Sequence, residues 1–222
     1  MVNATEHVEV RVRSRGDGRS ADVEAPAWSG EPLVEAACVL IASRQNVSPK
    51  RLVEPGPSGA QLELLFVAAA AAPDHGQLLP WRFVIVPQDK RGLLANVFAL
   101  ALIDRDPSAT MIQIEAAREK AHRAPLLMLA VARLVSEREP EIPNLERMVS
   151  LGCAVQNLLL ASQAMGFGAG LTSGQAMSSE RMSALFKLVV EEQAVCFVNI
   201  GTVSKSKAAR VRPSPDQFVT SL

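Results

Sequence analysis

The most constraining feature of the sequence is a continuous apolar run at residues 125–133, PLLMLAVAR. A half-exposed strand alternates apolar and polar side chains, whereas an unbroken apolar run of this length is typical of a strand buried on both faces. A strand of that kind needs a layer of structure on each side. The sequence therefore predicts helices packed around one central sheet.

The neighbouring segments support this arrangement, because strand and helix patterns alternate along the chain. The helix that follows Pro57 is expected to begin with a capping box of Ser58 and Gln61 and to end before Pro73. The pattern at 144–165 is apolar nearly all round, which predicts a helix running through the core. Further helices are expected at 32–43, 89–103, 108–122 and 178–189 (with Ser178 as N-cap), and strands at 82–86, 168–173 and 194–203.

Length and charge limit the classes of function. The chain has 222 residues, with 23 basic and 23 acidic side chains, so nothing indicates a general nucleic-acid binder or a membrane anchor. Residues 1–30 are predicted to be a separate N-terminal extension, either a flexible tail or a strand-like arm, and residues 31–222 one domain. Three distant cysteines without a CxxC motif predict buried free thiols and a reducing, cytoplasmic location.

The usual catalytic signatures are absent from the sequence. It contains no GxSxG, P-loop, HExxH or strand-linked GxGxxG motif, and only three histidines and no tyrosine are available for acid–base chemistry. A chain with so few reactive side chains is expected to leave the chemistry to a cofactor and to supply binding and orientation.

Four motifs, taken together, carry a family resemblance. They are Ala72-Pro-Asp-His75, Pro80-Trp-Arg-Phe83, Gly166-Phe-Gly-Ala-Gly-Leu-Thr-Ser-Gly174 and Ile200-Gly-Thr202. In this order and spacing the chain resembles the FMN-dependent nitroreductase family, and most of all its compact bacterial branch, from about residue 31 to the C-terminus. By geometry alone, the Gly-rich motif fits a helix terminus or a phosphate cradle.

The resemblance implies a fold, a cofactor and an assembly. We expect a three-layer α+β fold, with a central mixed, mainly antiparallel sheet flanked by helices. We also expect an obligate homodimer with FMN in clefts at the interface. Such proteins take hydride from NADH or NADPH and reduce nitroaromatics, quinones or similar small acceptors in a ping-pong cycle.

The resemblance also assigns a phosphate and ribityl site to the Ser43-Arg-Gln-Asn46 segment. Arg44 matches an arginine that holds the phosphate, and a guanidinium suits this role because it can form a bidentate contact. Its alternative is a solvated arginine at a helix end. Gln45 and Asn46 stand where the family has Arg and Ser, so one positive charge is lost although both can donate hydrogen bonds.

Two further positions are implied to reach FMN from the partner chain. His75 matches a flavin-contacting histidine of the branch; alternatively, it is a loop histidine bonded to Asp74. Ala71 stands where the branch has an arginine, which removes a second charge.

The remaining implied contacts come late in the chain. Leu171, Thr172 and Ser173 align with a triplet, usually Trp-Arg-Ser, that contacts the flavin. The backbone groups of this triplet and the Ser173 hydroxyl could still contact the flavin ring. Lys205 and Lys207 follow the last strand, either near the phosphate or as a solvated basic tail. Because the charges expected at residues 45 and 71 are missing, the competing hypothesis is a catalytically weakened dimeric flavin-fold protein that acts as a ligand-binding or scaffold protein.

Overall fold

The fold is built on a single five-stranded sheet. The computed structural model describes residues 31–135, 141–208 and 211–222, so the predicted extension at residues 1–30 lies outside the described residues. The named strands pair antiparallel, with the order β1-β5-β3-β2 and β4 paired with β5, and an isolated parallel bridge joins Asn46 to Ala169, so the sheet is mainly antiparallel, as expected. The strands are β1 (Leu52–Val53), β2 (Trp81–Ile85), β3 (Leu126–Arg133), β4 (Gly168–Thr172) and β5 (Glu192–Val203).

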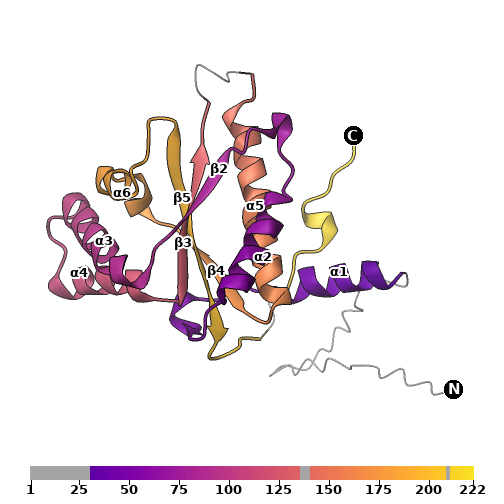
Figure 1. Cartoon of the computed structure of the whole chain (residues 1–222), viewed down its shortest axis with the longest axis horizontal. Coiled ribbons are helices and arrows are strands. Elements are labelled where there is room, and N and C mark those ends of the chain that lie inside the picture. Colours follow the sequence, from indigo (N-terminus) through magenta and orange to yellow (C-terminus); the bar gives the residue numbers. More distant parts are fainter. Residues whose placement is uncertain (1–30, 136–140, 209–210) are drawn as a thin grey trace.

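Helices cover both faces of this sheet (Figure 1). On one face lie α2 and α5, and on the other lie α3, α4 and α6, whereas α1 extends from the body beside the end of α5. The three-layer α+β prediction is therefore confirmed. The helices are α1 (Pro32–Ser43), α2 (Gly59–Ala70), α3 (Arg91–Arg105), α4 (Met111–Arg118), α5 (Asn144–Ala164) and α6 (Glu180–Phe186).

Strand β3 shows why the apolar run is continuous. Met128, Ala130 and Ala132 are buried in the core under α2 and α5. Their neighbours Leu127, Leu129 and Val131 are buried in the second core, under α3 and α6. Because successive side chains of a strand point to opposite faces, both sets must be apolar.

Most predicted elements are confirmed within a few residues. The capping box of Ser58 and Gln61 forms and starts α2. The N-cap of α6, in contrast, is Ser179, whose hydroxyl accepts from the Met182 N–H, because Ser178 belongs to the preceding turn and donates to Gln175. The helix predicted at 108–122 is α4 followed by a short 3-10 turn, 119–122.

All three cysteines are free thiols, as predicted, but only one of them is fully buried. Cys196 is buried, and burial raises its pKa to about 11, whereas Cys38 and Cys153 are half-buried. Within the described residues, no helix is both long and apolar enough to cross a membrane.

A buried arginine ties three elements together at one end of the sheet. Arg91, at the start of α3, is only 1% exposed. Its guanidinium donates to the carbonyls of Val86 and Ala121, each at 2.8 Å, and to Pro125 at 3.2 Å. These bonds tie the start of α3 to the connection from α4 to β3, and they supply the buried guanidinium with acceptors.

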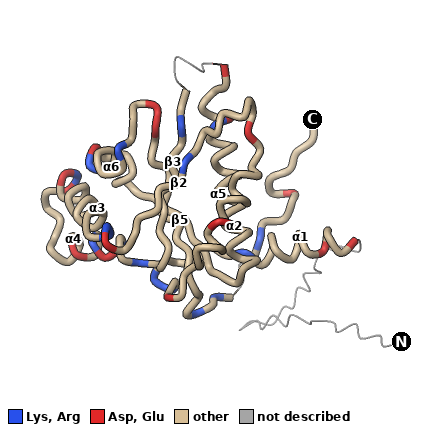
Figure 2. The backbone as a smooth tube through the Cα atoms, in the orientation of Figure 1, with Lys and Arg blue, Asp and Glu red and all other residues tan. Residues whose placement is uncertain are grey.

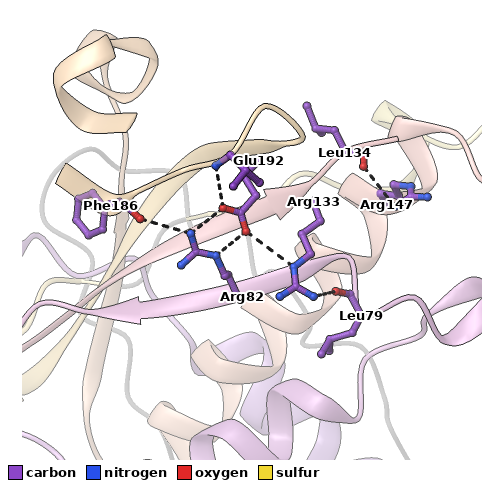
Figure 3. Close-up of polar contacts among 8 residues, drawn as sticks. Leu79, Arg82, Arg133, Leu134, Arg147, Phe186 and Glu192 are labelled. Carbon is purple, nitrogen blue, oxygen red and sulfur yellow. Dashed lines mark hydrogen bonds and ion pairs between the residues drawn. The ribbon is translucent and has the colours of Figure 1, made fainter. Parts of the chain in front are cut away.

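An ion pair joins three adjacent strands at the opposite end (Figure 3). Arg82 on β2 donates to both carboxylate oxygens of Glu192 on β5, at 2.6 and 2.7 Å. Arg133 on β3 approaches the same carboxylate at 3.9 Å and donates to the carbonyl of Leu79. The hydrogen bond from Arg82 lowers the pKa of the Glu192 carboxyl below its ordinary value.

We expect Glu192→Gln to lower the free energy of unfolding by about 2 kcal/mol at neutral pH, because the charge-assisted pair is lost. Since the pKa of Glu192 is lowered in the folded state, its contribution is present above the ordinary carboxyl pKa of 4.5 and disappears as the pH falls. Urea unfolding at several pH values measures this. Glu115→Gln, which removes an exposed pair with Arg118, is the control and should change little. A pH-independent difference would contradict the assignment.

Candidate functional site

The segment after α1 runs along the outer edge of β4. The Val47 N–H donates to the carbonyl of Ala169 at 2.8 Å. The Asn46 side-chain oxygen accepts from the Leu171 N–H, also at 2.8 Å. Two predicted groups that are about 125 residues apart in sequence, at 44–46 and 171–173, are therefore in direct contact.

Two glycines of β4 make this contact possible. A Cβ atom on Gly170 would lie 2.0 Å from the Val47 carbonyl oxygen, and one on Gly168 would lie 2.4 Å from the Val203 side chain. Gly166, with a φ of 83°, ends the preceding helical segment. In the Gly-rich motif, Gly166 is thus the predicted helix terminus. Gly170 allows the backbone of 46–48 to approach β4, whereas Gly168 makes room for the side chains of Val203 and Val47.

A small pocket of about 160 Å³, here called the basic pocket, lies where this segment meets the chain after β5. Four predicted residues line it: Gln45, Asn46, Lys205 and Lys207. The Gln45 amide also donates to the Lys207 carbonyl at 3.5 Å. Arg51 adds a third cation, and no carboxylate is among the described lining residues. The pocket therefore favours a small anionic group.

Arg44 lies beside the basic pocket and is not among its lining residues. Its Nε atom is buried and has no hydrogen-bond acceptor among the described residues. Its carbonyl accepts from Arg212 at 2.6 Å, which brings a further cation to this region. Nε is thus shielded from water, unlike the Nε of a fully solvated arginine at a helix end, and a buried donor without an acceptor is costly unless a ligand supplies one.

A second and larger pocket, here called the sheet pocket, has a volume of about 730 Å³. It lies between α3, α4, the end of β4 and β5, and its lining includes Thr172 and Ser173 of the predicted triplet. Ser48 lines both pockets, so they adjoin. Apolar walls with a few polar groups and a volume of this size are typical of sites for small organic ligands.

The polar groups of the sheet pocket are held in place by β5. Asn199 is buried and donates to the carbonyl of Gly170 and to the hydroxyl of Thr172, at 3.2 and 3.0 Å. The Ser173 hydroxyl donates to the Val195 carbonyl at 3.1 Å, so only its lone pairs remain for a ligand. Leu171 packs against the core under α2 and α5, on the other face of the strand.

Ala71 and His75 lie apart from these two pockets. Ala71 is exposed at the end of α2, and the exposed His75 ring nitrogen Nδ1 is 2.7 Å from the Glu146 carboxylate at the start of α5. The alternative of a bond between His75 and Asp74 is therefore wrong, because Asp74 accepts from the Leu79 N–H instead. One chain thus presents the predicted residues as two separate groups.

An apolar surface runs over α1, α2 and α5. No residue of α1 is buried, and Leu33, Val39 and Val67 are 79%, 62% and 66% exposed. Figure 2 shows few charged residues along α2 and the middle of α5. Exposed apolar area of this extent is typical of an interaction surface.

Sequence reasoning missed several residues of the site. Asn199 could have been found, because an amide inside an apolar strand needs hydrogen-bond partners and often marks a site. Ser48 could have been found because it follows the predicted phosphate segment closely. Three cations at the sheet pocket, Arg105, Lys120 and Arg123, carry no such signal, since basic residues near helix ends are common.

Comparison with known proteins identifies the family. The profile described as "Nitroreductase family" matches residues 41–202. The chain belongs to the nitroreductase family. Two curated relatives named "Putative NAD(P)H nitroreductase", one from Haemophilus influenzae and one (YdjA) from Escherichia coli K12, are each 32% identical to this nitroreductase. The matches cover 84% and 83% of the chain and 99% and 98% of the relatives. The family match places the protein among the oxidoreductases.

Solved structures agree with the fold of this family member. A nitroreductase-like protein from Bacillus cereus has a TM-score of 0.72 at 16% identity, covering 83% of this chain and 95% of its own. The FMN-dependent nitroreductase NfnB from Mycobacterium smegmatis, solved with NADPH, has a TM-score of 0.65 at 16% identity, with coverage of 86% and 99%. At these identities the likeness concerns the fold.

We expect Gly170→Ala to destabilise this nitroreductase by about 2–3 kcal/mol, because the new methyl group would push residues 46–48 away from β4. Thermal unfolding measures the loss. Gly92→Ala is the matched control, since nothing lies within 4 Å of its Cβ position and the residue is helical. The control should be neutral or slightly stabilising. Equal stability of both variants would contradict the close approach of the two segments.

Proposed function

We propose that this nitroreductase is an FMN-dependent NAD(P)H oxidoreductase that reduces nitroaromatic, quinone or similar small acceptors in a ping-pong cycle. One observation carries the proposal. Three segments that are far apart in sequence, at 44–46, 171–173 and 205–207, converge on two adjoining pockets. The first pocket is small and cationic, and the second is larger and mostly apolar, which matches the two ends of a flavin nucleotide.

The residues of the basic pocket fit a phosphate group. Lys205 and Lys207 supply charge, and the side chains of Gln45 and Asn46 have amide donors. The buried Nε of Arg44, which has no acceptor among the described residues, would gain one. The cations at 205, 207 and 212 replace the charges that are missing at residues 45 and 71.

The end of β4 would serve the ring system. Thr172, Ser173 and Ser48 line the sheet pocket, and the positions of Thr172 and Ser173 are held by hydrogen bonds to Asn199 and Val195 of strand β5. When bound, FMN supplies the hydride acceptor for NADH or NADPH and the electron donor for the substrate. The chain would contribute orientation and exclusion of water, and the transfer of hydride from the nicotinamide needs no acid–base side chain.

We also propose that the protein is a homodimer in which a second copy covers the apolar surface of α1, α2 and α5. The support is that this surface remains exposed in one chain. A second support is that Ala71 and His75 lie apart from both pockets, as expected if they act on the cofactor of the partner. The hydrogen bond between His75 and Glu146 would then fix the histidine ring at the interface.

The test of the flavin proposal is the visible spectrum of the purified protein, with and without added FMN, before and after anaerobic addition of NADH or NADPH. We expect a bound flavin band that bleaches on reduction. A colourless protein that does not retain FMN would contradict the proposal and favour the scaffold hypothesis.

Matched variants locate the phosphate in the same experiment. Arg44→Ala should weaken FMN binding about tenfold or more, because a charge-assisted hydrogen bond is lost, while thermal unfolding stays the same. Lys50→Ala, an exposed cation outside both pockets, is the control. If Arg44→Ala binds FMN normally and the double variant Lys205→Ala, Lys207→Ala does not, the lysines alone hold the phosphate.

For the dimer, we expect light scattering to give a mass of twice 23.8 kDa for the protein. Val39→Glu should produce monomers, because it places a charge in the apolar surface. Val190→Glu is the matched control, since Val190 is 96% exposed in the turn before β5, away from this surface. A monomeric parent protein, or equal dimerisation of both variants, would contradict the proposed interface.

A further inference from the structure

The sheet pocket combines apolar walls with charged lining residues that are all positive. Its walls include Phe98, Leu102, Leu127 and Phe197, and the rings of Phe98 and Phe197 meet edge-to-face with centroids 5.7 Å apart. A volume of about 730 Å³ is sufficient for an aromatic ligand of one or two rings in addition to part of a cofactor.

Three cations stand around the same pocket. Arg105 ends α3, Lys120 lies in the turn after α4, and Arg123 precedes β3. Arg105 and Lys120 are exposed and Arg123 is half-buried, so their charges lie at the mouth. No aspartate or glutamate is among the described lining residues. This local excess contrasts with the whole chain, whose 23 basic and 23 acidic residues balance.

The acidic residues nearby neutralise the mouth only in part. The Asp106 carboxylate accepts from the backbone and the hydroxyl of Ser108, at 3.1 and 2.6 Å, and it also attracts the charge of its neighbour Arg105. Glu119 is 73% exposed and reaches Arg123 only at 4.0 Å. Glu115 pairs with Arg118, which does not line the pocket. Weak exposed pairs of this kind leave the potential at the mouth positive.

The turn that carries Lys120 and Arg123 is held in place by the buried side chain of Arg91. The guanidinium of Arg91 donates to the carbonyls of Ala121 and Arg123, at 2.8 and 3.3 Å. The backbone that carries Lys120 and Arg123 is therefore fixed before a ligand arrives. A preorganised group loses less entropy on binding, which makes even an exposed cation useful for recognition.

We propose that the mouth of the sheet pocket selects an anionic aromatic acceptor, one with a flat ring that enters the apolar interior and a carboxylate that faces Arg105, Lys120 and Arg123. This inference rests on the proposed function and specifies its acceptor class. The phosphates of the dinucleotide reductant are the other source of negative charge, and the experiment separates the two.

The first measurement is equilibrium binding of naphthoate and of naphthamide by calorimetry, with the FMN-supplemented protein and with the protein alone. The two compounds share one ring system and differ by one charge, and neither is a nitro or quinone acceptor. We expect naphthoate to bind about tenfold more tightly at low salt, and the preference to shrink as salt screens the exposed cations. Equal affinity for the two compounds would overturn the inference.

Variants assign the preference to the mouth. Lys120→Gln with Arg123→Gln should remove most of it, since both charges are lost while the polar character remains. The control is Lys90→Gln with Lys187→Gln, which changes the net charge equally at two exposed positions outside the pocket. A preference that survives in the mouth variant, or that falls equally in the control, would overturn the inference.

The second measurement separates the acceptor from the reductant. We expect the mouth variant to raise KM for para-nitrobenzoate about tenfold and to leave KM for para-nitrobenzamide and for NADH within about twofold. A rise for the dinucleotide alone would assign the cations to its phosphates and overturn the inference. If FMN fails to bind but the protein still prefers naphthoate, the proposed function is wrong and the anionic-ligand site remains.

Discussion

The candidate site depends on one close contact, between the backbone of residues 46–48 and the glycines of β4. The Val47 carbonyl oxygen occupies the space that a side chain at position 170 would need, so only glycine fits there. Two hydrogen bonds, from Val47 to Ala169 and from Leu171 to Asn46, hold the segments together. Through this contact, the residues after α1 reach both the triplet at the end of β4 and the basic chain after β5.

The layers of the fold explain why the two pockets differ. The α2 and α5 face of the sheet is closed by apolar side chains, and further apolar side chains lie exposed on the outside of the helices. On the opposite face, α3 and α4 leave the sheet pocket between themselves and β5. Arg91 fixes the turn at the edge of that pocket through backbone carbonyls, so its cations project from a rigid base.

Much of the fold was predictable because its signals are local. The unbroken run at 125–133 required cover on both faces, and the structure supplies it. The capping box at Ser58 depends on residues three positions apart, so it is legible in the sequence. The wrong assignment of the α6 N-cap has a similar local cause, since two adjacent serines offer the same chemistry and only the turn geometry selects Ser179.

By itself, the sequence determined the family through its motifs, the alternation of strands and helices, and four of the residues that line the basic pocket. Only the tertiary structure decided which of these residues meet. It separates Ala71 and His75 from the rest, engages Ser173 with β5, and adds Ser48, Asn199 and the cations of the mouth. The physical reason is that local patterns fix the elements, whereas a binding site is formed by contacts between residues far apart in the chain, which depend on how the layers pack.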